Sequence, residues 1–143
     1  MKRWIFGLCA LLCTTSLVGC GSTALPDPPP AAVDSPVAGK KVAYIMQMAP
    51  SDIFQMWSQS AQETAEGLGM EYDAFFCGGS DAQWQDTISQ CAAAGYDGLL
   101  VSHGNQDGSY VFLKELTENY PDLKLVCFDT QFYTDGEYQK IEG

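Results

Sequence analysis

The chain has 143 residues, of which 18 are acidic and 7 are basic, so its formal net charge is −11. Nucleic-acid binding needs clustered Lys and Arg, and this acidic composition excludes it as an expected function. Acidity of this kind confers solubility and says little about a ligand.

The first 19 residues have the pattern of an export signal. A basic start (residues 1–3) precedes an apolar stretch, residues 4–17, that is too short to span a bilayer comfortably. The stretch ends in LVGC, which resembles the lipobox of bacterial lipoproteins. The resemblance implies lipidation of Cys20 and a cell-membrane anchor on the extracytoplasmic face. An ordinary secretion signal is the alternative.

Residues 20–39 contain five of the seven prolines and few side chains able to pack. This composition predicts a semi-stiff tether between the lipid and a folded domain. Residues 40–143 are long enough for one modest core. The domain has three cysteines, Cys77, Cys91 and Cys127. They lie in apolar contexts outside any C-x-x-C motif, so we expect buried free thiols and no metal site, with one disulfide as the alternative.

A strand and a helix begin the domain. Residues 41–47 form a continuous apolar run, which predicts a strand covered on both faces. Ser51 can cap the following helix. Residues 70–77 alternate, as in a strand at a sheet edge. The helix after Ser51 carries one apolar stripe that is expected to face the core. The stripe consists of Ile53, Trp57, Ala61, Thr64 and Leu68.

Two further helix–strand units follow. Ser80 and Gln83 have the spacing of a capping box, and the helix that they open carries an apolar stripe. Residues 97–102 and 123–129 predict two more strands, with a third helix between them that ends before Pro121. The order β-α-β-α-β-α-β indicates an α/β fold with a Rossmann-like, doubly wound parallel sheet.

Ligands of such sheets bind beyond the carboxyl ends of the strands. The loops at that edge are rich in polar and aromatic residues, whereas the opposite edge consists of plain turns. A binding face is therefore expected there, and six residues are candidates for ligand contact: Ser51, Phe54, Asp81, His103, Asp129 and Gln131. Phe54 can stack on a sugar ring or a base, or pack under the corner. Asp129 can accept hydroxyl hydrogen bonds, or cap a turn.

The sequence contains none of the common catalytic motifs. No glycine-rich phosphate loop follows a strand, no G-x-S-x-G elbow is present, and His103 is the single histidine. We therefore expect a protein that is not an enzyme and needs no cofactor or metal.

Four stretches carry a family resemblance: SDIF (residues 51–54), AQETAEGLGM (61–70), SDAQWQDTISQCAAAGYDGLLVS (80–102) and VCFDTQ (126–131). Together they resemble the N-terminal lobe of bacterial periplasmic solute-binding proteins of the ribose- and galactose-binding type (periplasmic binding protein type 1 fold). Ser51-Asp52 stands where the family commonly has Asn-Pro. The family's second lobe has no counterpart here, so we expect residues 40–143 to be an incomplete receptor that binds only weakly alone.

The resemblance implies a monomeric receptor of an ABC transporter. Such a receptor captures a sugar or another polyhydroxylated small molecule and delivers it to a membrane permease, without covalent chemistry. Residues 115–131 also resemble the nucleoside-binding lipoproteins of the basic membrane protein family, which is the nearest alternative. A sensor that docks on a chemoreceptor or kinase is a further one.

Overall fold

The computed structural model describes residues 34–102, 104–129, 131–134 and 136–139. The predicted signal peptide, Cys20 and most of the predicted tether lie outside this part of the chain, as does His103. Among the residues described, no helix is both long and apolar enough to cross a membrane.

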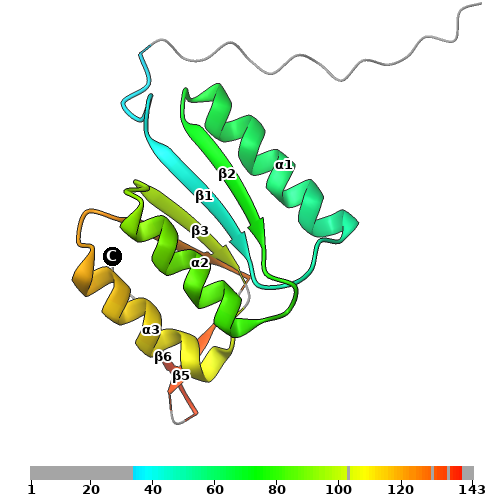
Figure 1. Cartoon of the computed structure of the whole chain (residues 1–143), viewed down its shortest axis with the longest axis vertical. Helices are drawn as coiled ribbons and strands as arrows, with labels where there is room; N and C mark the ends of the chain where they lie inside the picture. The colour runs from blue at the N-terminus through cyan, green and yellow to red at the C-terminus, as the bar shows by residue number, and fades with distance from the viewer. Residues whose placement is uncertain (1–33, 103, 130, 135, 140–143) are drawn as a thin grey trace, which may run out of the picture.

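Three helices alternate with four strands, and a short hairpin follows them (Figure 1). The elements are β1 (Lys41–Met46), α1 (Asp52–Gly67), β2 (Glu71–Phe76), α2 (Asp81–Ala93), β3 (Gly98–Ser102), α3 (Gln106–Asn119), β4 (Lys124–Phe128), β5 (Phe132–Thr134) and β6 (Glu137–Gln139). The first four strands form one parallel sheet in the order β2-β1-β3-β4. The predicted α/β class, the parallel sheet and the edge position of β2 are therefore confirmed.

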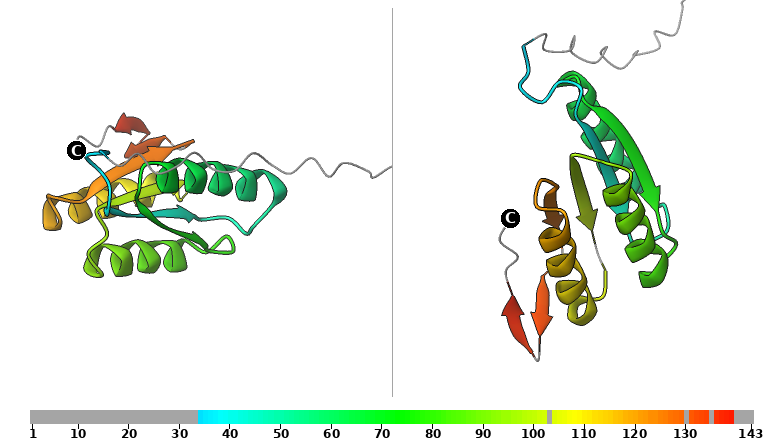
Figure 2. Two further views of the ribbon diagram at one scale, coloured as in Figure 1. Left: turned by 90° about the horizontal axis from the view of Figure 1, so that it is seen from above. Right: turned by 60° about the vertical axis from the view of Figure 1, so that its left-hand side comes forward.

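The main core lies between the sheet and the pair α2 and α3. Successive strand residues point to opposite faces, and Ala43, Ile45 and Leu99 pack with Trp84 of α2 and Leu113 of α3. Helix α1 packs on β1 and β2. Figure 2 shows α1 on one side of the sheet and α2 on the other. One face of the sheet is thus covered by two helices, and the other by one.

Both predicted helix caps are present. The Ser51 hydroxyl accepts a hydrogen bond from the Phe54 amide at 3.5 Å, and the Ser80 hydroxyl accepts one from the Gln83 amide at 3.2 Å. Each bond satisfies an amide that the first turn of a helix leaves without a backbone partner. The two helices therefore begin where the sequence indicated.

The predicted inner stripe of α1 is wrong as a core stripe, because three of its five residues are exposed and the other two are half-buried. Ile53 is 49% exposed, and the buried α1 residues are Ser58 and Ala65. Thr64 and Leu68 are also exposed. The stripe faces the part of the sheet beside α1 that no helix covers, which is why its apolar periodicity did not translate into burial.

The hairpin of β5 and β6 was not predicted. Its antiparallel strands have three residues each, too few to show a clear alternation in the sequence. Phe132 is 5% exposed and belongs to the main core, while Tyr133 and Tyr138 form an edge-to-face pair. The hairpin extends the α3 side of the core after the sheet has ended.

The three described cysteines are free thiols, as the sequence indicated. Cys77 and Cys91 are buried and Cys127 is half-buried. Burial raises the pKa of both the Cys91 and the Cys127 thiols to about 11. Because the thiolate is the reactive form, these side chains act as apolar packing groups at neutral pH.

Ion pairs hold the amino end of the sheet together. Asp97 accepts a hydrogen bond from the Lys40 ammonium at 2.7 Å and from the Lys41 amide at 2.8 Å. Beside it, the Lys41 ammonium lies 3.3 Å from the Asp73 carboxylate, which also accepts a hydrogen bond from the Tyr96 hydroxyl. The Lys40 ammonium, followed by the Lys41 amide, lowers the pKa of Asp97. Two lysines and two aspartates of this edge are therefore paired: Lys40 with Asp97, and Lys41 with Asp73.

Replacing Asp97 with Asn tests this arrangement. A carboxyl group with a lowered folded-state pKa stabilises the fold above its unfolded pKa, and this contribution is lost as the pH falls through the folded value. Asp97→Asn should therefore lower the urea midpoint at neutral pH, and the difference from wild type should shrink below about pH 4. Asp122→Asn, in an exposed turn, is the control. An equal difference at both pH values would contradict the pairing.

Candidate functional site

The carboxyl ends of the four strands meet at one edge, which we call the carboxyl rim. Met46 lies opposite Phe76 and Ser102 in the sheet register, and Ser102 lies opposite Phe128. Backbone bonds continue just beyond the strands, from the Gln47 amide to Ser102 and from the Cys77 amide to Met46. The loops that the sequence assigned to one edge therefore begin side by side.

Asp129 follows β4 directly at this rim. Its φ is 53°, and it is the one non-glycine residue with a positive φ in the described part of the chain. The left-handed conformation is tolerated best by Gly, Asn and Asp. The exposed carboxylate accepts a hydrogen bond from the hydroxyl of Ser102, which is fully buried at the end of β3. A buried neighbour thus fixes a side chain that faces solvent.

A chain of aromatic rings links α1 to the strand ends. Phe54 and Trp57 have ring centroids 5.6 Å apart, and Trp57 meets Phe128 edge to face at 6.0 Å. Phe128 then contacts Tyr44 at 5.5 Å, and Tyr44 contacts Phe76 at 6.0 Å. Such centroid separations are typical of favourable aromatic pairs. Phe54 and Asp129, predicted from separate loops, are therefore joined by Trp57 and Phe128.

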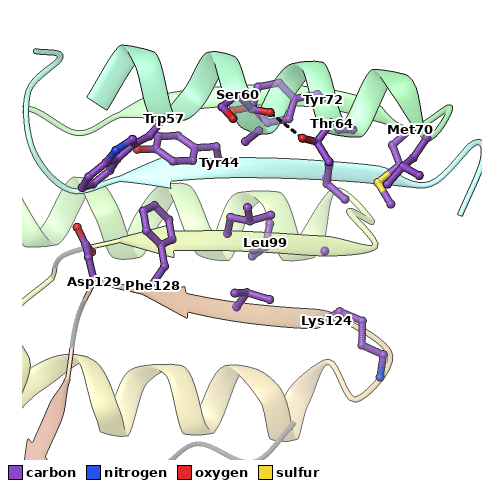
Figure 3. Close-up of a pocket in the computed structure, with 17 residues that line it drawn as sticks. Tyr44, Trp57, Ser60, Thr64, Met70, Tyr72, Leu99, Lys124, Phe128 and Asp129 are labelled. Atoms are coloured by element: carbon purple, nitrogen blue, oxygen red, sulfur yellow. Dashed lines mark hydrogen bonds between the residues drawn. The ribbon is translucent and has the colours of Figure 1, made fainter. Parts of the chain in front are cut away.

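A hollow of about 760 Å³ runs along the sheet from these rings, and we call it the trough. Its floor is the α1 side of the sheet, and α1 forms one wall. Asp129, Phe128 and Trp57 lie at its carboxyl end, whereas Met70 and Lys124 lie at the opposite end (Figure 3). Phe54 does not line it. Apolar side chains make up most of its surface: Val42, Tyr44, Ala61, Leu68, Leu100 and Val126.

The Tyr44 hydroxyl is a buried polar group without a hydrogen-bond partner in the described structure. Tyr44 is 1% exposed, and burial, with smaller effects from Tyr72 and Asp129, raises the pKa of its hydroxyl. Tyr72 differs, because its hydroxyl donates to the Ser58 carbonyl at 2.9 Å. Unsatisfied buried polar groups are rare in folded proteins, so Tyr44 requires an explanation.

The other predicted site residues lie on or near the rim but have structural partners. Ser51 caps α1. Asp81 accepts a hydrogen bond from the Gln47 side-chain amide at 3.2 Å, which ties α2 to the end of β1. Gln131 is exposed and accepts the Tyr133 hydroxyl at 2.9 Å. Ser51, Asp81 and Gln131 thus have local structural contacts. Asp129 and Phe54, in contrast, are linked to one another through Trp57 and Phe128.

Four residues of the site were not predicted: Tyr44, Trp57, Ser102 and Phe128. The sequence did contain a signal for two of them, because Tyr44 and Ser102 put hydroxyl groups into otherwise apolar strands. Trp57 belonged to the expected core stripe. Phe128 was read as the penultimate residue of a strand, and only the strand order shows that it meets Ser102.

The described residues contain no cluster of three His, Cys, Asp or Glu side chains that could hold a metal ion. The chemistry that the rim offers is hydrogen bonding by a fixed carboxylate beside aromatic faces. The sequence matches no protein-family profile and no curated protein. Any functional assignment therefore depends on the geometry of the site and on the motifs of the chain.

Two Tyr→Phe variants test the unsatisfied hydroxyl. Tyr44→Phe removes a buried group with no partner, so the free energy of unfolding should stay the same or rise. Tyr72→Phe is the matched control and should lower it by about 1 kcal/mol, because it breaks the bond to Ser58. Urea unfolding measures both. A loss at Tyr44 as large as that at Tyr72 would show that the Tyr44 hydroxyl has a partner.

Proposed function

We propose that the protein is a lipid-anchored solute receptor on the extracytoplasmic face of the cell membrane. In this proposal it captures a sugar or a similar polyhydroxylated molecule at the carboxyl rim and passes it to an ABC transporter permease. The anchor rests on the lipobox-like sequence at Cys20. The binding step rests on the rim, and it involves no covalent chemistry.

The observation that carries the proposal is the position of Asp129. Its carboxylate is exposed, is oriented by Ser102, and lies at the end of the trough where Trp57 and Phe128 meet. A carboxylate accepts several hydroxyl hydrogen bonds, and bonds to a charged acceptor are stronger than neutral ones. An aromatic ring beside it suits the C–H face of a sugar.

The local backbone supports a functional role for this carboxylate. A left-handed non-glycine residue costs about 1–2 kcal/mol, and such residues concentrate at sites of function. Ligand binding beyond the carboxyl ends of the strands is also the general rule for parallel α/β sheets. The conformation and its location therefore favour the same conclusion.

The rim supplies one wall of a binding cleft, so we expect roughly millimolar affinity for this chain. A titration of the isotope-labelled protein followed by NMR detects such binding. Sugars should shift the Asp129 amide and the Trp57 indole signals. If nucleosides shift these signals and sugars do not, the nucleoside receptor is favoured instead, with a base stacked on the aromatic rings.

Asp129→Asn tests the role of the charge. Asn tolerates the left-handed conformation and can still accept a bond from Ser102, so the fold should persist. Loss of a charge-assisted hydrogen bond should weaken sugar binding about 10- to 100-fold. Asp122→Asn, on the opposite edge of the sheet, should bind as wild type does. Unchanged binding by Asp129→Asn would remove the basis of the proposal.

A further inference from the structure

Gly104, in the loop between β3 and α3, lies directly against two buried side chains. A Cβ atom at this position would be 2.8 Å from the Ser109 hydroxyl oxygen, and 3.0 and 3.2 Å from Cη2 and Cζ3 of the Trp84 ring. Nonbonded carbon atoms prefer separations of about 3.5–4.0 Å. The φ of Gly104 is 100°, which residues with a Cβ rarely adopt. Space and backbone conformation therefore both require glycine here.

The two side chains under Gly104 have no room to retreat. Trp84 is fully buried, and the centroid of its ring lies 6.1 Å from that of Phe112 on α3. Ser109 is 1% exposed. Close-packed interiors yield little to an added methyl group. Gly104 itself is half-buried and Asn105 is exposed, so the loop is the part that an added side chain would displace.

The loop connects this contact to the carboxyl rim. Three residues join Ser102, the last residue of β3, to α3. The loop is fixed to the helix at Asn105, whose side chain accepts a hydrogen bond from the Gly108 amide at 3.3 Å. At the other end of the loop, the Ser102 hydroxyl donates a hydrogen bond to the Asp129 carboxylate. Because Asn105 is held, a displacement of Gly104 is passed on toward Ser102.

We propose that Gly104 is a positioning residue for Asp129 and that it acts through Ser102. The close contact of the loop with Trp84 sets the direction in which the Ser102 hydroxyl meets the carboxylate. A hydrogen bond weakens steeply as its angle closes, and a binding group tolerates only small errors of position. The inference rests on the proposed function, because it makes sugar affinity depend on a residue to which no ligand contact is assigned.

The carboxyl carbon signal of Asp129, recorded by NMR on the labelled full chain without ligand, tests the positioning directly. Ser102→Ala gives the signal that results from loss of the hydrogen bond. Gly104→Ala should shift the signal in the same direction, and it should cause no further shift when Ser102→Ala is already present. An unchanged signal in Gly104→Ala, or equal shifts with and without Ser102→Ala, would overturn the inference.

Gly78→Ala is the matched control. Gly78 follows β2 at the same rim and also has a positive φ, 63°, but no atom lies within 4 Å of its Cβ position. The two variants therefore add the same methyl group at a positive φ, and only one of them meets a neighbour. Gly78→Ala should leave the Asp129 signal where it is in wild type. Equal shifts in both variants would show that backbone strain, and not the contact with Trp84, is the cause.

A milder variant covers the case in which Gly104→Ala does not fold, which urea unfolding reveals. Gly104→Ala/Ser109→Ala lacks the nearest neighbour of the new Cβ but keeps the Trp84 ring. The Ser109 hydroxyl has no partner among the described residues, so its removal breaks no hydrogen bond there. The Asp129 signal of this double variant should lie between those of wild type and Ser102→Ala. A wild-type signal would contradict the inference.

Sugar titrations of the same variants separate this inference from the proposed function. Gly104→Ala should weaken sugar binding about tenfold, the effect of one misdirected hydrogen bond to a charged group. Gly78→Ala should bind as wild type does. If no sugar binds to wild type, the proposed function is removed, and the carboxyl signals still show whether Gly104 positions Asp129. If sugar binds equally to wild type and to both glycine variants, only the inference is wrong.

Discussion

The parallel pairing of β1 with both β2 and β3 determines the rest of the structure. It aligns the last residues of the strands, so that Met46 lies between Phe76 and Ser102, and the loops that follow start from one edge. The pairing also assigns alternate strand residues to two different faces. Ala43 and Ile45 enter the main core, and Val42 and Tyr44 enter the trough.

The two faces of the sheet differ in what completes them. On the α2 and α3 side, Trp84 and Leu113 are fully buried and the packing is closed. On the α1 side, the described residues place one helix over half of the sheet and leave a largely apolar hollow, with Asp129 at one end and Lys124 at the other. The amino end of the sheet is held by ion pairs such as Lys40–Asp97, whereas the carboxyl end presents a fixed carboxylate and aromatic rings.

The sequence predicted most of the fold because its local signals agreed with one another. Ser51 and Ser80 predicted where the first two helices begin. The hydrophobic patterns predicted all four strands of the main sheet. The position of Asp129 at the carboxyl rim was also predicted from the sequence, since it follows a strand of such a sheet. The exposure of Ile53 could not be predicted, because a helical period shows which residues share a face and not what covers it. The contact between Trp57 and Phe128 depends on strand order, which spacing along the chain does not contain.

The backbone of Asp129 has a consequence for how this protein can change over evolutionary time. Glycine adopts the left-handed conformation without steric cost, so a glycine at this position would relax the turn. It would also remove the carboxylate that accepts the hydrogen bond from the buried Ser102 hydroxyl, and losing a buried hydrogen bond costs about 1 kcal/mol or more. The two effects oppose each other, so selection for stability alone does not favour replacement of the acidic residue by glycine.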